Sequence, residues 1–198
     1  MREIKYDKEL HIKVGYQGME GSNSEAASKE FIDKLKLTNV ELIPLVTSGN
    51  VIDKLTKGEI DYGVMAVENS IGGVVEETKK AVKGVNIELI TTVVLPIHHT
   101  MFYKSANIKK EDIKVIASHI QALKQSADYI QDKYPEAKIL EVEDTAISAK
   151  YLSEGKLGED TAIIARKNAG ELYNLHMVAD KIESTTNNKT TFHIYKLN

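Results

Sequence analysis

The 198-residue sequence contains no cysteine and no tryptophan, and it has only three prolines and three phenylalanines. Without cysteine, the chain has no disulfide framework, no zinc ribbon and no thiolate nucleophile. No window approaches the ~18 apolar residues of a membrane span. Residues 1–14, MREIKYDKELHIKV, are charged and contain no apolar stretch of signal length. We therefore expect a cytoplasmic protein that does not enter a membrane.

An excess of charge of one sign is also missing, because 29 acidic side chains oppose 26 basic ones for a net charge of −3. This balance gives no basic surface that would bind nucleic acid or an anionic membrane. Hydrophobic residues make up 42% of the chain, which is enough to form a substantial core. The composition predicts a globular protein whose partner is neither nucleic acid nor membrane.

Strand and helix patterns alternate along the chain. The expected strands include residues 11–16, 40–46, 60–68, 114–119, 137–143, 160–165, 176–182 and 187–197, and the expected helices are 24–36, 49–58, 73–84, 121–134, 146–155 and 166–174. This order predicts an α/β fold with mostly parallel sheets covered on both faces. Residues 87–103 form a β-rich run longer than one sheet usually needs, so the run could cross between two lobes.

Ligands of open α/β sheets bind beyond the carboxyl ends of the strands, so the residues that follow each strand are candidates for a site. The first strand leads into GYQGMEGSNSE (15–25), which matches neither a dinucleotide fingerprint nor a P-loop. Ser22 and Glu25 have the spacing of a capping box. The first-turn amides there could hold a carboxylate or phosphate, although Ser22 could equally serve only as a helix cap.

Glu68, Asn69 and Ser70 follow another strand and precede two glycines. An acid and an amide at this point suit a binding edge, and a plain turn would use the same residues. Asp144 and Thr145 open a later helix, where a capping role would be sufficient.

Ser118 ends a further strand and is well placed to be the N-cap of the next helix. Gln121 and Gln125 are four residues apart on that helix and share one face, which could be a binding face or simply a solvated one. His98 and His99 are adjacent on a strand and therefore point to opposite faces. Because no HxH, HExxH or Cys/His cluster is present, no metal site is expected.

Six blocks in this order resemble the catalytic domain of prephenate dehydratase, over about residues 13–197. They are GYQGMEGSNSEAAS, MAVENSIGGVV, LPIHHTMF, SHIQALKQ, AIIARKNAGELYNL and NNKTTF. Asn174 stands where the family has a glycine, and asparagine tolerates the left-handed conformation of such a cap.

The resemblance implies two α/β lobes like those of type 2 periplasmic binding proteins, with crossover strands and a cleft between the lobes. Residues 1–96 plus 178–198 would form the first lobe, and residues 97–177 the second. The family usually carries a C-terminal ACT domain that binds phenylalanine, which would begin where this sequence ends, at Asn198.

The resemblance also implies decarboxylation and dehydration of prephenate to phenylpyruvate, without cofactor or metal, by a homodimer. The residues implied as catalytic are Thr190, Glu68 and Asn69, with Glu68 a conceivable proton source if it lies protonated in a dry cleft. The residues implied to bind substrate are Ser22, Ser70, Ser118, Gln125, Thr145, Lys189 and Thr191.

The main departure from the family is Thr191, which replaces an arginine of the last motif. Threonine cannot replace the planar, charged fork of arginine. Lys189 would lie on the same strand face as Thr191 and could bring a cation there, and Arg166 or Lys124 are other sources of charge. Two alternatives therefore stay open: a relative that decarboxylates prephenate without aromatising it, and a non-catalytic ligand-binding module.

Overall fold

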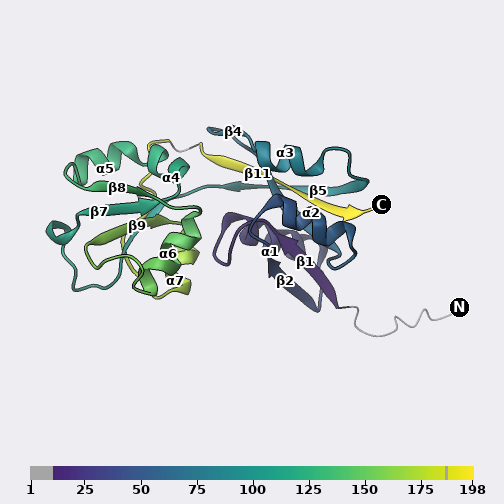
Figure 1. The fold of residues 1–198 in the computed structure, drawn as a ribbon, viewed down its shortest axis with the longest axis horizontal. Coiled ribbons are helices and arrows are strands. Elements are labelled where there is room, and N and C mark those ends of the chain that lie inside the picture. The colour runs from purple at the N-terminus through teal and green to yellow at the C-terminus, as the bar shows by residue number, and fades with distance from the viewer. Residues whose placement is uncertain (1–10, 186) are drawn as a thin grey trace, which may run out of the picture.

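The computed structural model describes residues 11–185 and 187–198. The chain forms two lobes, each built on one sheet, and two long extended segments run from one lobe to the other (Figure 1). Residues 1–10, which the sequence analysis assigned to the first lobe, lie outside the described residues. No helix in the described part of the chain is long and apolar enough to cross a membrane.

The first lobe contains a six-stranded sheet in the order β2-β1-β3-β11-β5, with β4 paired to β3. The strands are β1 (Ile12–Tyr16), β2 (Val40–Pro44), β3 (Tyr62–Asn69), β4 (Gly73–Val74), β5 (Ile87–Pro96) and β11 (Lys189–Leu197). The helices of this lobe are α1 (Asn23–Leu35), α2 (Ser48–Thr56) and α3 (Glu76–Val82).

The second lobe contains a five-stranded sheet in the order β10-β6-β9-β7-β8. The strands are β6 (Thr100–Tyr103), β7 (Val115–Ser118), β8 (Lys138–Glu141), β9 (Thr161–Ala165) and β10 (His176–Ala179). The helices are η1 (Lys110–Asp112), α4 (Ile120–Gln125), α5 (Ala127–Lys133), α6 (Thr145–Ser153) and α7 (Lys167–Leu172). The expected single helix 121–134 is thus two helices that meet at Ser126.

Both sheets are mixed, which corrects the expectation of mostly parallel sheets. In the first sheet β1 pairs in parallel with β2 and β3, whereas β11 is antiparallel to both β3 and β5. The physical reason is that β5 leaves this lobe and β11 returns to it without a helical crossover (Figure 1). The β-rich run 87–103 does cross, because β5 and β6 belong to different sheets.

The return of the chain to the first lobe comes later than the expected residue 178. That residue lies inside β10, which pairs with β6 of the second sheet. Ile182 still belongs to the second lobe's core, alongside Met101 and Ile116. The first sheet is joined again at β11, where Phe192 packs with Phe31 in the first lobe's core.

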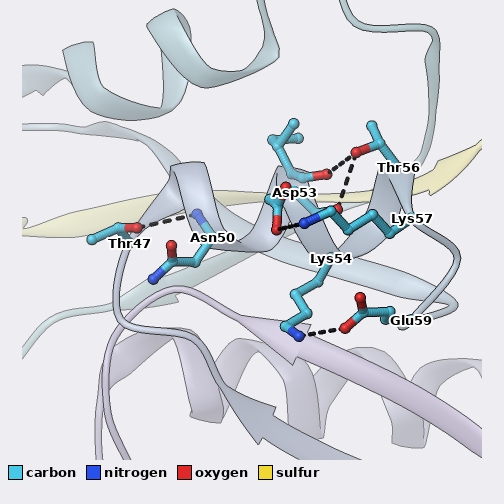
Figure 2. A network of polar contacts seen from close by, with 8 residues as sticks. Thr47, Asn50, Asp53, Lys54, Thr56, Lys57 and Glu59 are labelled. Carbon is cyan, nitrogen blue, oxygen red and sulfur yellow. Dashed lines mark hydrogen bonds and ion pairs between the residues drawn. The ribbon is translucent and has the colours of Figure 1, made fainter.

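Local capping fixes where the helices start and stop. Figure 2 shows helix α2, where the Thr47 hydroxyl accepts a hydrogen bond from the Asn50 amide at 3.1 Å. Along the same helix Lys57 pairs with Asp53 at 2.8 Å, an i,i+4 ion pair in the favourable order (Figure 2). The left-handed conformation predicted at Asn174 is confirmed, since its φ is 53°. Such caps hold the α2 N-terminus at a fixed point, and Thr47 lines the cleft described below.

Candidate active site

A cleft of about 580 Å³ lies between the two lobes. Its polar lining comes from Gln17, Ser22, Asn23, Ser24, Thr47, Asn69, Glu77, His99, His119, Gln121, Gln125, Glu143, Asp144, Thr145 and Thr190. Apolar side chains such as Ile97, Ile147 and Phe192 form the rest of its wall. A concave space with apolar walls and a few converging polar groups is the usual form of a small-molecule site.

Thr190 lies at the start of β11, on the face of the strand that turns into the cleft, and is 9% exposed. Its Oγ1 accepts a hydrogen bond from Asn69 Nδ2 at 2.9 Å. The two residues are partners across β3 and β11. Among the described residues no acceptor is found for the Thr190 hydroxyl hydrogen. The hydroxyl therefore keeps its own hydrogen for a molecule in the cleft.

The orientation of Asn69 is set by the backbone of the turn that follows it. The amides of Ile71 and Gly72 donate to Asn69 Oδ1 at 3.0 and 2.8 Å. Backbone N–H groups can only donate, so the side-chain oxygen must face them and Nδ2 must face Thr190. The polar residues before the two glycines are therefore both a turn and part of the cleft wall.

Several helices present their N-terminal ends to the cleft. Ser22 is the N-cap of α1 and accepts from the Glu25 amide at 3.3 Å, while Asn23 and Ser24 of the first turn line the cleft. Asp144 is the N-cap of α6 and accepts from the Ala146 amide at 2.7 Å. The positive ends of these helix dipoles favour a bound anion.

Charged side chains in the cleft wall are used mainly by the protein itself. The two Glu77 oxygens accept from the Ser48 amide at 2.8 Å and from Gln17 Nε2 at 3.0 Å. Burial raises the pKa of Asp144, and hydrogen bonds from the backbone of α6 oppose that rise. No group of three or more His, Cys, Asp or Glu side chains in the described chain is arranged to hold a metal ion.

Lysine and arginine are absent from the residues of the described chain that line the cleft. Arg166 lies behind Asn23, and its Nη1 donates to Asn23 Oδ1 at 2.6 Å. Burial lowers the pKa of this guanidinium, while the Glu25 carboxylate acts in the opposite direction. Lys124 is exposed and is not part of the cleft lining.

Five of the ten expected site residues line the cleft: Ser22, Asn69, Gln125, Thr145 and Thr190. The other five do not, and each lies on a different face or makes structural hydrogen bonds. Lys189 and Glu68 are exposed, and Thr191 faces away from Thr190 because strand side chains alternate. The expectation that Glu68 lies in a dry cleft is wrong, since its cross-strand partner is Thr191 and not Thr190.

Ser118 and Ser70 make hydrogen bonds that hold the fold. Ser118 is fully buried and donates to the Ile164 carbonyl at 2.5 Å, and the N-cap of α4 is His119 instead. Ser70 Oγ donates to the Asn187 carbonyl and accepts from the Lys189 amide, both at 2.9 Å. These contacts join the β3 turn to the segment that leads into β11.

The structure adds cleft residues that the sequence analysis did not select. Gln17, Asn23, Thr47 and His119 line the cleft from the ends of β1, α1, α2 and β7. The signal for them was present, because each follows a strand or begins a helix near a residue that was selected. Their side-chain direction depends on loop geometry, which the sequence pattern does not define.

His98 and His99 lie in the link between β5 and β6 and not on a strand, so strand alternation does not apply to them, but their side chains do contact different groups. His98 Nδ1 lies 2.7 Å from a Glu183 oxygen, whereas His99 lines the cleft. The pKa of His99 is lowered because burial disfavours the charged ring, and this effect outweighs the opposing effect of the hydrogen bond with Gln125. His99 thus brings a neutral imidazole to the cleft wall at neutral pH.

Comparison with known proteins connects this geometry with one family. The family model described as "Prephenate dehydratase" matches residues 14–197. Arogenate dehydratase 5 of Arabidopsis thaliana is 31% identical over 181 residues, covering 91% of this chain and 41% of the relative. The chain spans 41% of the length of that relative and 62% of the length of the prephenate dehydratase of Lactococcus lactis.

Solved structures share the fold. A prephenate dehydratase from Arthrobacter aurescens, in complex with L-Phe, superposes with a TM-score of 0.84 at 23% identity, covering 94% of this chain and 61% of that one. A putative methionine-binding lipoprotein from Bacillus subtilis superposes with a TM-score of 0.52 at 15% identity, covering 94% and 83%. The predicted class of two α/β lobes resembling binding proteins is thereby confirmed.

Proposed function

Because the chain belongs to the prephenate dehydratase family, we propose that it converts prephenate to phenylpyruvate as a lyase, in phenylalanine biosynthesis. One observation carries the proposal: the Thr190 hydroxyl accepts from Asn69 Nδ2 and keeps its own hydrogen for the cleft. The reaction needs such a group, because a hydroxyl leaves the ring readily only when a donor stabilises the departing oxygen.

The chemistry balances without a cofactor. Prephenate carries two carboxylates and a ring hydroxyl. As the ring carboxylate leaves as CO2, its bonding electrons form the aromatic ring and expel the hydroxyl, which takes up one proton and departs as water. Thr190 acts in this proposal as an oriented donor to the leaving oxygen, since a threonine hydroxyl is too weak an acid to supply free protons. The proton that completes the departing water comes from solvent.

Substrate binding in this proposal relies on neutral donors and helix ends. The backbone amides of Asn23 and Ser24 lie in the first turn of α1, at the positive end of its dipole, and would suit a carboxylate. Gln125 and Thr145 extend from the second lobe and would hold the other end of the substrate. Arg166 adds positive charge behind Asn23, which partly offsets the lack of a cation in the lining.

Two finer features belong to the proposal as well, namely a cytoplasmic location and a homodimer. The dimer is supported by β5, which is an edge strand of the first sheet with Leu89 and Val94 exposed at 46% and 50%. Light scattering on the purified protein tests it, and a single monomer mass at micromolar concentration contradicts it.

Incubation with prephenate, followed by mass analysis of the products, tests the proposed function. Phenylpyruvate above the non-enzymatic background is the expected product. A decarboxylated product that keeps its hydroxyl would identify a decarboxylase, and binding without turnover would identify a binding module. A parallel incubation with arogenate, whose amino group replaces the keto oxygen, would yield phenylalanine if that is the preferred substrate.

A further inference from the structure

A continuous chain of side-chain hydrogen bonds joins the two lobes at the cleft. Asn69 Nδ2 donates to Asn188 Oδ1 at 2.8 Å, and Asn188 Nδ2 donates to Gln125 Oε1 at 2.7 Å. The same Gln125 oxygen lies 2.7 Å from His99 Nε2. Asn188 is 2% exposed and lies in the segment that returns the chain to the first lobe, so it is the link between β3 and α4.

Backbone groups determine which atom donates and which accepts at the Asn69 end of this series of hydrogen bonds. Asn69 Oδ1 receives the amides of Ile71 and Gly72, and Asn69 Nδ2 also lies 3.1 Å from the carbonyl of Lys189. A carbonyl can only accept and an amide N–H can only donate. Asn69 is therefore locked, and the atom of Asn188 that faces Asn69 must be its oxygen.

The direction passes along the rest of the chain. With its oxygen toward Asn69, Asn188 has only its NH₂ group to offer Gln125, so Gln125 must present Oε1. Because that oxygen cannot donate, the hydrogen in the contact with His99 must be on His99 Nε2. The ring's other nitrogen, Nδ1, has no hydrogen-bond partner among the described residues.

We propose that Asn188 is a positioning residue that carries this direction across the lobes and holds His99 as the Nε2–H tautomer. The catalytic consequence of this inference rests on the proposed function, whereas the tautomer does not. In this arrangement the Gln125 oxygen is fully used, and its NH₂ group has no partner among the described residues. Thr190 and Gln125 line the cleft and keep an unused donor among the described residues, and His99, which also lines the cleft, keeps an unused acceptor.

Asn188→Asp should exchange donor and acceptor in the hydrogen bond between residue 188 and Gln125. A carboxylate at this position can only accept, so Gln125 must rotate to donate its NH₂ group, and that group then also faces His99. His99 Nε2 must give up its hydrogen and Nδ1 must take it. Asn187→Asp is the matched control, because it adds the same charge one residue away on an exposed side chain.

Long-range ¹H–¹⁵N correlation spectra of the histidine rings, recorded above the pKa of His99, report the tautomer directly. His99→Gln identifies the His99 signals. The expected result is Nε2–H in the wild-type protein and in Asn187→Asp, and Nδ1–H in Asn188→Asp. Prephenate turnover should fall about 100-fold in Asn188→Asp, as expected when reacting groups lose their alignment, and remain unchanged in Asn187→Asp.

The wild-type spectrum alone can overturn the inference, because it depends on no variant being folded. A wild-type Nδ1–H tautomer would contradict it, and so would an Nε2–H tautomer that persists in a folded Asn188→Asp protein. If the tautomers behave as expected but no variant or wild-type protein turns over prephenate, the proposed function fails while the positioning role stands.

Discussion

Asn69→Asp should show how much turnover depends on the orientation of the Thr190 hydroxyl, because this change keeps the hydroxyl but alters the partner to which it donates. The carboxylate keeps an oxygen for the amides of Ile71 and Gly72, so the turn after β3 is retained. What changes is the other atom, which becomes an acceptor facing the oxygens of Asn188, Lys189 and Thr190. The Thr190 hydroxyl then donates to the carboxylate instead of pointing its hydrogen into the cleft.

The size of the effect follows from the groups lost. The two N–H donors of Asn69 disappear, and at about 1 kcal/mol each the free energy of unfolding should fall by about 2 kcal/mol. For a chain of this length that corresponds to roughly 4–8 °C in Tm. Turnover should fall much further, by about 10²–10⁴-fold, because the donor to the leaving oxygen is lost.

The assay is kcat for phenylpyruvate formation, measured below the lowered Tm, together with urea denaturation. Asn86→Asp is the charge control, since the oxygen of Asn86 accepts from Asn198 Nδ2 at 2.7 Å and a carboxylate would keep that bond. Its stability and kcat should be unchanged. A folded Asn69→Asp protein with wild-type kcat would refute the reasoning.

Three further substitutions concern the framework of the two lobes. Burial raises the pKa of Glu183, but hydrogen bonds from His98 and from the backbone outweigh it and lower that pKa overall. A lowered folded-state pKa stabilises the fold above the unfolded carboxyl's pKa, and that contribution disappears as the pH falls through the folded value. Glu183→Gln should thus cost about 1–3 kcal/mol near neutral pH and progressively less in acid, which urea titrations at several pH values will measure. Gly170→Ala should destabilise by at least about 1–3 kcal/mol, because a Cβ there would lie 2.2 Å from Phe102 Cε1. Gly49→Ala in α2, where the nearest contact is 3.8 Å away, should instead raise the free energy of unfolding by about 0.5–1 kcal/mol. Equal changes in stability at the two glycines would contradict the claim that Phe102 leaves no room for a side chain at position 170.

The fold was largely predictable because most elements have a clear period and end at recognisable residues. Gly58 and Gly84, both at positive φ, follow helices that were expected to end there, and Asn174 adopts the left-handed conformation expected of it. Strand direction was not predictable in the same way. The antiparallel pairing of β11 with β3 and β5 depends on long-range contacts that no local pattern encodes.

The site was predictable by position and less so by side-chain direction. Thr190 and Asn69 were selected from their motifs, and both line the cleft. Glu68 belongs to the same motif but points away, because neighbouring residues on a strand face opposite sides. The pairing of β3 with β11 also shifts in register between Thr191 and Phe192, where Ala66 rather than Val67 lies opposite Phe192. Alternation could have excluded Glu68 once Asn69 was accepted.

The roles of Asn188 and His99 were hidden for a different reason. Asn188 is one of two adjacent asparagines, and only the structure shows that its neighbour Asn187 is exposed while Asn188 bridges the lobes. The sequence separation between Asn69 and Asn188 is 119 residues. No local spacing can reveal a hydrogen bond over that distance along the chain.

The most direct test of the account is a comparison of kcat for prephenate between Thr190→Ser and Thr190→Val. Both side chains fit the site, but only serine keeps a hydroxyl that can accept from Asn69 and donate into the cleft. The account predicts that Thr190→Ser stays within about tenfold of wild type, whereas Thr190→Val loses about 10²–10⁴-fold. Comparable turnover by a folded Thr190→Val protein would contradict the claim that this hydroxyl assists the departure of water.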